Sequence, residues 1–452
     1  MKRLMLVGLA GGMFTVWAAG PFDKAVLHGE TNLARAIDYA PNEEMTFILT
    51  LLNAGAFVKG EYFVQWTRTG DDGQTVKGRI DAKDLPLVVK TKIDRPGFVR
   101  LQAFVVDKTG KQYQKSFLGD RTTPEGQKAM NAFEKTDKRV FFDGGAGVQP
   151  EKLESVPEPV DFDAFWTRRR ARLAKVPLEA EKREVKSPSK LVKAYAVSIK
   201  CAGPRPSTGY LTVPVKQGKY PVRISFHGYG HRFPNKGHVI SPIAGDGKII
   251  WFNFSPHGYE LGREPEYYDE FYRSICCGES TFGFNGDQNR DPENCYFSGF
   301  TYRIMRALEW LKTLPEWDGK NLIVGGGSMG GMQSMWAIGL DKDVTEAYAS
   351  IPWNCDIGGR DTMKRIVNPW YIRETPALRY YDPVNIVKRA NPDCRVEVVR
   401  AGLGDYHCPP SGVSILYNNL PCVKKINWIQ GSTHGYVPPE ENCQKFSISE
   451  RW

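Results

Sequence analysis

The segment between residues 322 and 340 limits the possible folds of this chain more than any other, because a strand pattern there runs directly into a helix pattern. Leu322–Val324 is apolar and predicts a buried strand, and residues 328–340 predict a helix. The turn between them reads Gly326-x-Ser328-x-Gly330. A serine on so sharp a turn needs neighbours without a Cβ. The segment therefore predicts a nucleophile elbow that carries Ser328 in an α/β fold.

The same residues also fit a second kind of site. Gly325-x-Gly327-x-x-Gly330 is the glycine pattern of a dinucleotide-binding turn, and Asp356 follows a later strand, where it could bind a ribose. The two interpretations differ in what they require further along the chain. A hydrolase needs an acid and then a histidine after later strands, in that order, whereas a dinucleotide site needs neither.

Both required side chains are present. Asp405 follows the predicted strand 396–399, and His434 follows the predicted strand 426–429. Polar residues just beyond parallel strands lie at the edge of the sheet where α/β proteins place their sites. We therefore predict that His434 takes the proton of Ser328 and that Asp405 holds the imidazole of His434 in the required tautomer.

An oxyanion hole needs backbone amides from an earlier loop and from the residue that follows the nucleophile. The predicted strand 222–226 ends in His227-Gly228-Tyr229-Gly230, where the glycines allow the backbone to turn its N–H groups inward. We expect the amides of Tyr229 and Met329 to be the donors.

Strand and turn patterns divide the chain into two structural parts. Residues 22–145 alternate apolar and polar positions between Asp- and Gly-containing turns, which predicts an all-β sandwich of immunoglobulin-like type without chemistry of its own. Residues 146–452 alternate strands with helices, which predicts a mostly parallel sheet with helices on both faces. The expected fold class is therefore α/β, with an all-β accessory domain in front.

The N-terminus and the charge balance restrict location and partners. Lys2 and Arg3 precede an apolar stretch, so residues 1–18 predict a cleaved signal peptide and a secreted or periplasmic protein with no membrane contact after cleavage; a retained anchor is the alternative. The chain has 61 Lys and Arg against 51 Asp and Glu, a net charge of +10 without a polybasic tract. Nucleic acid is therefore not expected as a partner, because phosphate binding needs positive charge concentrated on one face.

Two other groups of residues could suggest different chemistry. His227, His231, His238 and His257 lie close together in sequence, but their spacing is not that of a helical metal site, so we predict neither a metal nor a cofactor. Cys408 lies three residues beyond Asp405 without an elbow around it, and we expect it to be a packed core residue. The nine cysteines leave the disulfide connectivity open.

Over roughly residues 155–440 the chain resembles the acetyl xylan esterase and cephalosporin C deacetylase family, which are carbohydrate esterases of the α/β-hydrolase fold. The resemblance rests on segments in the expected order: Asp161–Trp166, Phe226–Gly230, Gly326–Gly331, Gly404-Asp405 with Cys408-Pro409-Pro410, and His434 with Tyr436 and Pro438. It implies that Ser328, Asp405 and His434 form the catalytic triad. It also implies that the amides of Tyr229 and Met329 form the oxyanion hole and that the substrates are short acyl esters of sugars, chiefly acetylated xylo-oligosaccharides.

The chain departs from this family at three places. Met329 stands where the family usually has Gln, and residues 254–258 replace an Arg-Gly-Gln-Gly motif. The segment from Cys276 to Cys295 is unusual, and the N-terminal β region lies outside the match. Because these changes flank the expected pocket, ester hydrolysis follows more directly than the identity of the acyl group or the sugar. The oligomeric state stays open.

Three hypotheses follow for the function. The first is a serine esterase that removes acetyl groups from plant polysaccharide fragments through an acyl-enzyme. The second keeps the fold and the triad but acts on another ester or on a peptide bond. The third is a carbohydrate-binding protein without catalysis, in which the β region is the working part.

Overall fold

We analysed a computed structural model of the chain, which describes residues 23–230, 242–439 and 443–452. The predicted signal peptide (1–18), His231 and His238 lie outside these residues. Within them, no helix combines the length and the apolar character needed to cross a bilayer.

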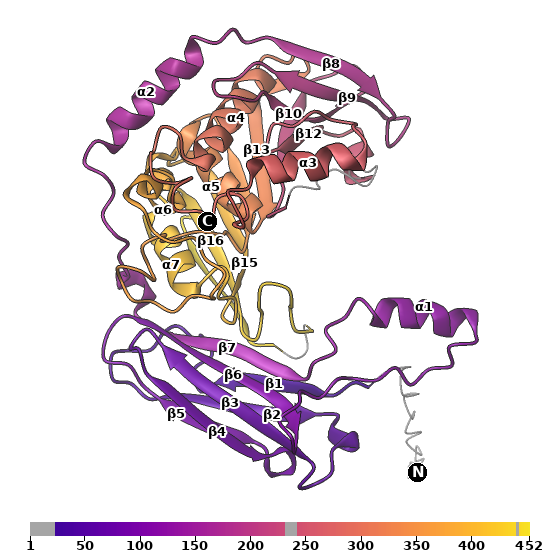
Figure 1. Ribbon diagram of the computed structural model, residues 1–452, viewed down its shortest axis with the longest axis vertical. Coiled ribbons are helices and arrows are strands. Elements are labelled where there is room, and N and C mark those ends of the chain that lie inside the picture. The colour runs from indigo at the N-terminus through magenta and orange to yellow at the C-terminus, as the bar shows by residue number, and fades with distance from the viewer. Residues whose placement is uncertain (1–22, 231–241, 440–442) are drawn as a thin grey trace, which may run out of the picture.

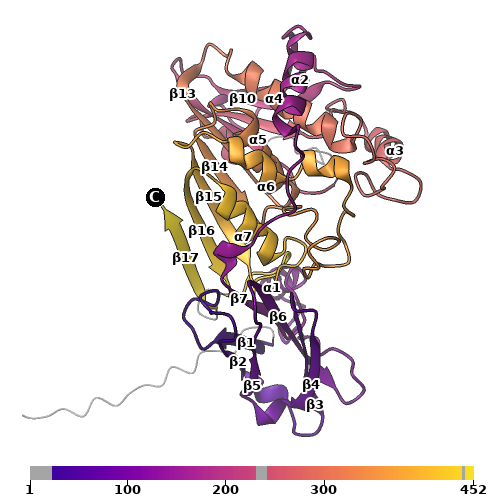
Figure 2. The same ribbon diagram turned by 90° about the vertical axis from the view of Figure 1, so that its left-hand side faces the viewer.

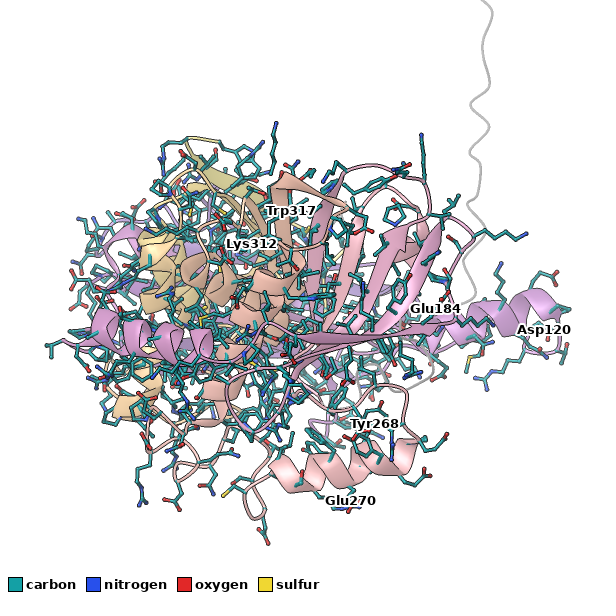
Figure 3. The ribbon with its side chains drawn as sticks, turned by 90° about the horizontal axis from the view of Figure 1, so that it is seen from above. Asp120, Glu184, Tyr268, Glu270, Lys312 and Trp317 are labelled. Carbon is teal, nitrogen blue, oxygen red and sulfur yellow. The ribbon has the colours of Figure 1, made fainter. Side chains whose placement is uncertain are left out.

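The first part of the structure is an antiparallel β-sandwich, as predicted. One sheet has the order β1-β2-β5 and the other has the order β4-β3-β6-β7, which is the strand arrangement of an immunoglobulin-like domain. Its strands are β1 (Val26–Thr31), β2 (Met45–Leu52), β3 (Tyr62–Gly70), β4 (Thr75–Asp81), β5 (Leu87–Thr91), β6 (Gly97–Asp107) and β7 (Phe141–Val148). Alternate residues of these strands, among them Phe47, Val64 and Leu101, fill the core between the sheets. A helix between β6 and β7, α1 (Pro124–Phe133), projects from the body of the domain (Figures 1 and 3).

The second part is built on a ten-stranded sheet of order β17-β16-β15-β14-β13-β11-β12-β10-β9-β8. The six central strands are parallel and the outer strands are antiparallel, which is the sheet of an α/β-hydrolase domain. The strands are β8 (Ala180–Val185), β9 (Val192–Ile199), β10 (Ser207–Pro214), β11 (Tyr220–Phe226), β12 (Ile250–Ser255), β13 (Trp317–Gly327), β14 (Glu346–Ser350), β15 (Arg395–Gly402), β16 (Val423–Ile429) and β17 (Lys445–Glu450).

The main helices of this domain cover one face of the sheet, in contrast to the expected cover on both faces (Figure 2). The helices are α2 (Phe162–Ala174), α3 (Pro265–Ile275), α4 (Tyr296–Leu311), α5 (Met329–Leu340), α6 (Pro383–Ile386) and α7 (Pro410–Asn419). Right-handed crossovers place α4, α5, α6 and α7 on the same face, because these connections all run in one direction across the sheet. The connection from β11 to β12 runs the other way, and residues 231–241 of it are not described. In Figure 3, α3 with Tyr268 and Glu270 lies to one side of the sheet.

The two parts pack closely against each other (Figure 1). Strand β7 is buried along its whole length. It ends at Val148, three residues beyond the predicted end of the β region at position 145. Gln430, which follows β16, exchanges two hydrogen bonds of 2.8 Å with the backbone N–H and C=O of Gly145. A side chain on Gly404 would lie 1.8 Å from the carbonyl oxygen of Asp143, so only glycine allows this approach. The loops that follow β15 and β16 therefore rest directly on the β-sandwich.

Candidate active site

Ser328 occupies a strained turn between β13 and α5. Its φ of 56° and ψ of −120° lie outside the regions that non-glycine residues ordinarily adopt. The surrounding backbone holds this conformation, because the Ser328 amide donates to the Ser350 carbonyl at 2.9 Å and the Trp353 amide donates to the Ser328 carbonyl at 3.1 Å. A serine held in a strained turn at the carboxyl end of a central strand is the local geometry that a nucleophile elbow requires.

The glycines of the turn allow α5 to approach β11 closely. A Cβ on Gly326 would lie 2.5 Å from the carbonyl oxygen of Phe226, and a Cβ on Gly330 would lie 2.3 Å from the same oxygen. Gln333, which is fully buried, reinforces this contact by donating to the carbonyls of His227 (3.1 Å) and Met329 (3.0 Å). The elbow and the loop after β11 therefore form one packed unit.

Asp405 and His434 lie side by side, in the loops after β15 and β16. His434 Nδ1 lies 3.1 Å and 3.3 Å from the two carboxylate oxygens of Asp405. Asp405 is fully buried, and its Oδ1 also accepts from the amides of His407 (3.1 Å) and Cys408 (3.0 Å). An ionised carboxylate only accepts, so Nδ1 of His434 carries the proton and Nε2 is left as a base.

Hydrogen bonds through Arg400 connect this pair to the elbow. The Arg400 carbonyl accepts from the amide of Ile351 at 2.8 Å, next to the Ser350 carbonyl that holds Ser328. The Arg400 guanidinium donates to the backbone carbonyl of His434 at 3.2 Å. The three loops at the carboxyl ends of β13, β15 and β16 are therefore fixed relative to one another, although β14 lies between β13 and β15 in the sheet.

The expected oxyanion loop lies beside the elbow. A Cβ on Gly228 would lie 3.6 Å from the carbonyl oxygen of Gly327. Within the described part of the chain, no backbone acceptor is paired with the amides of Tyr229 and Met329, the two predicted donors. Such amides can stabilise an oxygen that becomes negative during a reaction.

Aromatic side chains surround Tyr229. Its ring stacks on Phe282 at 4.2 Å, and its hydroxyl donates to the Phe282 carbonyl at 2.8 Å. The ring centres of Trp353 and Trp370 lie 5.7 Å and 5.0 Å from that of Tyr229, both in edge-to-face arrangements. Phe284 packs against both tryptophans. This cluster fixes the position of Tyr229 and gives the loop an apolar surrounding.

His407 is a neighbour of the Asp405–His434 pair that sequence reasoning missed. Its ring centre lies 4.9 Å from that of His434 and 5.8 Å from that of Trp370. Burial lowers the pKa of His407, and the neighbouring His434 lowers it further, so its ring is neutral at pH 7. Ligand atoms of Asp405, His407 and His434 lie within 4.8 Å of one another and could bind a metal ion. The Asp405 carboxylate, however, already accepts hydrogen bonds from two amides and faces Nδ1 of His434.

The structure also locates the residues of the alternative interpretations. Asp356 is buried and paired with Arg365, so its carboxylate is engaged within the protein. His257 uses both ring nitrogens, towards the Tyr296 hydroxyl and the Gly230 carbonyl, each at 2.9 Å. Cys408 is a buried core residue, and burial raises the pKa of its thiol well above the ordinary value.

The β-sandwich contributes buried charges beneath the acid loop, although its sequence indicated no chemistry. Arg100 pairs with Asp143 at 2.6 Å, and its guanidinium lies over the ring of Tyr406 at 4.3 Å. Tyr406 is the residue after Asp405. No local motif marks Arg100 or Asp143, because their role depends on how the two domains pack. In the described residues 23–148, the exposed large hydrophobic side chains are aliphatic, so no open aromatic platform is found there.

Comparison with known proteins gives a family match to the second domain. Residues 151–451 match the family model described as acetyl xylan esterase (AXE1). The chain is 32% identical over 308 residues to the acetyl esterase Axe7A of Xylanibacter ruminicola, and the match covers 64% of this chain and 68% of that protein.

The solved structures that resemble this one include two acetyl xylan esterases. The acetyl xylan esterase from Paenibacillus sp. R4 has a TM-score of 0.53 and 25% identity, covering 64% of this chain and 94% of that structure. Acetyl xylan esterase 1 from Thermoanaerobacterium sp. JW/SL YS485 has a TM-score of 0.51 and 22% identity, covering 65% of this chain and 93% of that structure; at this identity the likeness concerns the fold.

Proposed function

This chain belongs to the acetyl xylan esterase family, and from that premise we propose that it removes acetyl groups from xylan and related plant polysaccharide fragments through an acyl-enzyme. It is a carboxylic-ester hydrolase of the α/β-hydrolase fold. The observation that carries the proposed mechanism is the contact between Asp405 and His434 Nδ1, at the same sheet edge as the strained Ser328.

Acylation begins at Ser328. His434 is the general base, because Asp405 holds its Nδ1–H and leaves the Nε2 lone pair to take the Ser328 proton. The Ser328 oxygen attacks the ester carbonyl, and His434 then gives its proton to the leaving sugar hydroxyl. The buried negative charge of Asp405 stabilises the imidazolium that exists between these two transfers.

The amides of Tyr229 and Met329 stabilise the oxygen of each tetrahedral intermediate. One such donor contributes about 3 kcal/mol to transition-state stabilisation. Gln333 keeps the two donors in place, since it donates to the carbonyls of His227 and Met329 on either side of the hole. Water activated by His434 then attacks the acyl-enzyme and releases acetate.

The aromatic cluster around Tyr229 supports a short acyl group. Trp353 follows the loop that holds Ser328, and its ring packs at 5.7 Å from that of Tyr229. In this proposal the rings that pack around Tyr229 form the acyl end of the pocket, and their bulk restricts the size of the acid. We infer a preference for acetyl over longer or aromatic acyl groups. The N-terminal Lys2 and Arg3 with their apolar continuation support a secreted or periplasmic location, where polysaccharide fragments are found.

The proposal is tested with the purified full-length protein on a panel of acetylated, feruloylated and methyl-esterified glycans and a peptide substrate, with released acid measured by chromatography. We expect acetate release from acetylated xylan, and loss of activity in Ser328→Ala. Ser414→Ala is the matched control, because Ser414 is a buried serine of α7 whose hydroxyl has no hydrogen-bond partner among the described residues. Faster release of ferulate, methanol or peptide fragments than of acetate would refute the proposed substrate class. Parent activity in Ser328→Ala would refute the mechanism.

A further inference from the structure

A cavity of about 210 Å³ lies between α2, the loop after β9 and the first two turns of α4. Its charged lining residues are Arg172, Arg205, Arg303 and Glu293. Three arginines therefore face one glutamate, and that glutamate lies 3.6 Å from a different arginine, Arg169. The cavity wall carries an excess of positive charge.

Arg303 is the most unusual of these residues, because no described acidic residue pairs with its buried guanidinium. The side chain is fully buried, and Nε donates to the Pro256 carbonyl at 2.7 Å. Nη1 and Nη2 have no hydrogen-bond acceptor in the described residues. They lie over Gly299, where a Cβ would be 2.9 Å and 3.0 Å from them, and Gly299 also lines the cavity. Burial lowers the pKa of Arg303 to about 10, and the nearby charge of Arg205 adds to the effect.

Arg205 is half-buried beside it and is also without a carboxylate partner. No ion pair with a described acidic residue involves Arg205 or Arg303. The Nε of Arg205 is buried without an acceptor, while its guanidinium lies over the ring of Phe271 at 5.1 Å. Two neighbouring guanidinium groups that repel each other inside a protein are costly unless an anion compensates them.

We propose that this cavity binds one compact oxyanion, such as phosphate, sulfate or a small carboxylate, between Arg205 and Arg303. Arginine forks match the oxygens of such ions with paired N–H donors. The volume equals that of about seven liquid waters, which accommodates an ion of this size with part of its hydration shell. This proposal does not depend on the esterase function.

The cavity is connected to the oxyanion loop through two of its neighbours, Tyr296 and His257. Tyr296 lines the cavity, and its hydroxyl lies 2.9 Å from His257 Nδ1. His257 Nε2 lies 2.9 Å from the Gly230 carbonyl, at the end of the loop that carries Tyr229. A carbonyl only accepts, so Nε2 donates to Gly230 and Nδ1 accepts from Tyr296. An anion in the cavity, beside Tyr296, therefore stabilises the support of that loop.

The test measures anion binding to the full-length protein after dialysis into sodium gluconate, which serves as the background salt. Phosphate, sulfate, acetate and chloride are then titrated at constant ionic strength, with calorimetry and thermal unfolding as readouts. Ion chromatography of the denatured protein detects any anion that was retained. We expect one equivalent of oxyanion, either retained or taken up, and a midpoint temperature that rises with its concentration.

Arg303→Gln is expected to weaken the binding at least tenfold, in line with the loss of about 1.5 kcal/mol or more for a hydrogen bond to a charged group. Arg306→Gln is the matched control, because Arg306 is equally buried on the same helix but donates to the Leu173 and Val176 carbonyls outside the cavity lining. If Arg303→Gln does not fold, Arg205→Gln and the anomalous signal of selenate, a tetrahedral oxyanion, in soaked crystals replace it. The absence of any retained or titrated anion in the unmodified protein would overturn the proposal. Unchanged affinity in the Arg303 variant would overturn it as well, and so would unchanged affinity in the Arg205 variant where that one replaces it. Crystals in which selenate does not occupy the cavity would also overturn it.

Discussion

A methyl group added to Gly330 is expected to disable the active site by moving the elbow. The Cβ of Gly330→Ala would lie 2.3 Å from the Phe226 carbonyl oxygen and 3.1 Å from that of His227. Both contacts are with backbone, so no side-chain rotation relieves them. The start of α5 must therefore move away from the end of β11.

The size of this movement follows from the contact distance. A tolerable Cβ–oxygen separation is about 3.2 Å, so the backbone must open by about 0.9 Å from the observed 2.3 Å. Overpacking of this kind costs about 1–3 kcal/mol of stability. Ser328 lies two residues before Gly330, and Tyr229 lies three residues after Phe226. Since a misplacement of about 1 Å reduces catalysis about 100-fold, we expect kcat to fall by about that factor.

Gly339→Ala separates lost positioning from lost stability. Its Cβ would lie 2.2 Å from the Ile386 carbonyl oxygen, also a backbone atom, near the other end of the same helix. The two positions are nine residues apart, about 13 Å along the helix axis. This variant should lose a similar amount of stability and keep the kcat of the folded enzyme.

The assay is the initial rate on p-nitrophenyl acetate, divided by the folded fraction obtained from urea unfolding of each variant. We expect the kcat of Gly339→Ala to exceed that of Gly330→Ala about 100-fold. Equal kcat values in the two variants, or an unchanged kcat in Gly330→Ala, would refute the claim that the glycine contact positions the nucleophile.

Three further predictions concern the acid, the domain contact and the pH dependence. Asp405→Asn is expected to lower kcat about 10⁴-fold on aryl acetate at pH 7 with little change in KM, because Asn stabilises the wrong imidazole tautomer; a loss below tenfold would contradict the assignment. Gln430→Ala leaves the N–H and C=O of Gly145 unpaired in a buried contact, so urea unfolding should show a loss of about 2–4 kcal/mol; a loss under 0.5 kcal/mol would contradict it. Burial, with the adjacent charge of Asp356, raises the pKa of Asp382 to about 7. The folded state therefore holds a proton that the unfolded chain releases near pH 4, and this contribution to stability is lost as the pH rises towards 7. Unfolding measured from pH 5 to 8 should show this decline, and Asp382→Asn should flatten it.

The sequence predicted the parts of the site that depend on local chemistry. The turn at Ser328 needed glycines, and Asp405 and His434 followed strands, so the contact between Asp405 and His434 could be foreseen. The catalytic role of the three residues stays a prediction. The fold class and the immunoglobulin-like sandwich followed from strand periodicity in the same way.

The parts that could not be predicted depend on contacts between distant segments. Helices on both faces were expected, but the direction in which strands β13 to β16 follow one another places α5, α6 and α7 on a single face. His407 and Arg400 reach His434 only through the packing of neighbouring loops. The contact of Gln430 with Gly145 joins residues 285 positions apart and leaves no local pattern.

The most direct test of the central claim is covalent labelling of the active serine. The full-length protein is treated with a fluorophosphonate, and the modified residue is identified by peptide mass spectrometry. The loss of esterase activity is measured on the same samples. We predict one adduct per chain on Ser328, no adduct in Ser328→Ala, and much slower labelling in Asp405→Asn. An adduct on another residue that accompanies inactivation, or full activity with Ser328 modified, would contradict the account.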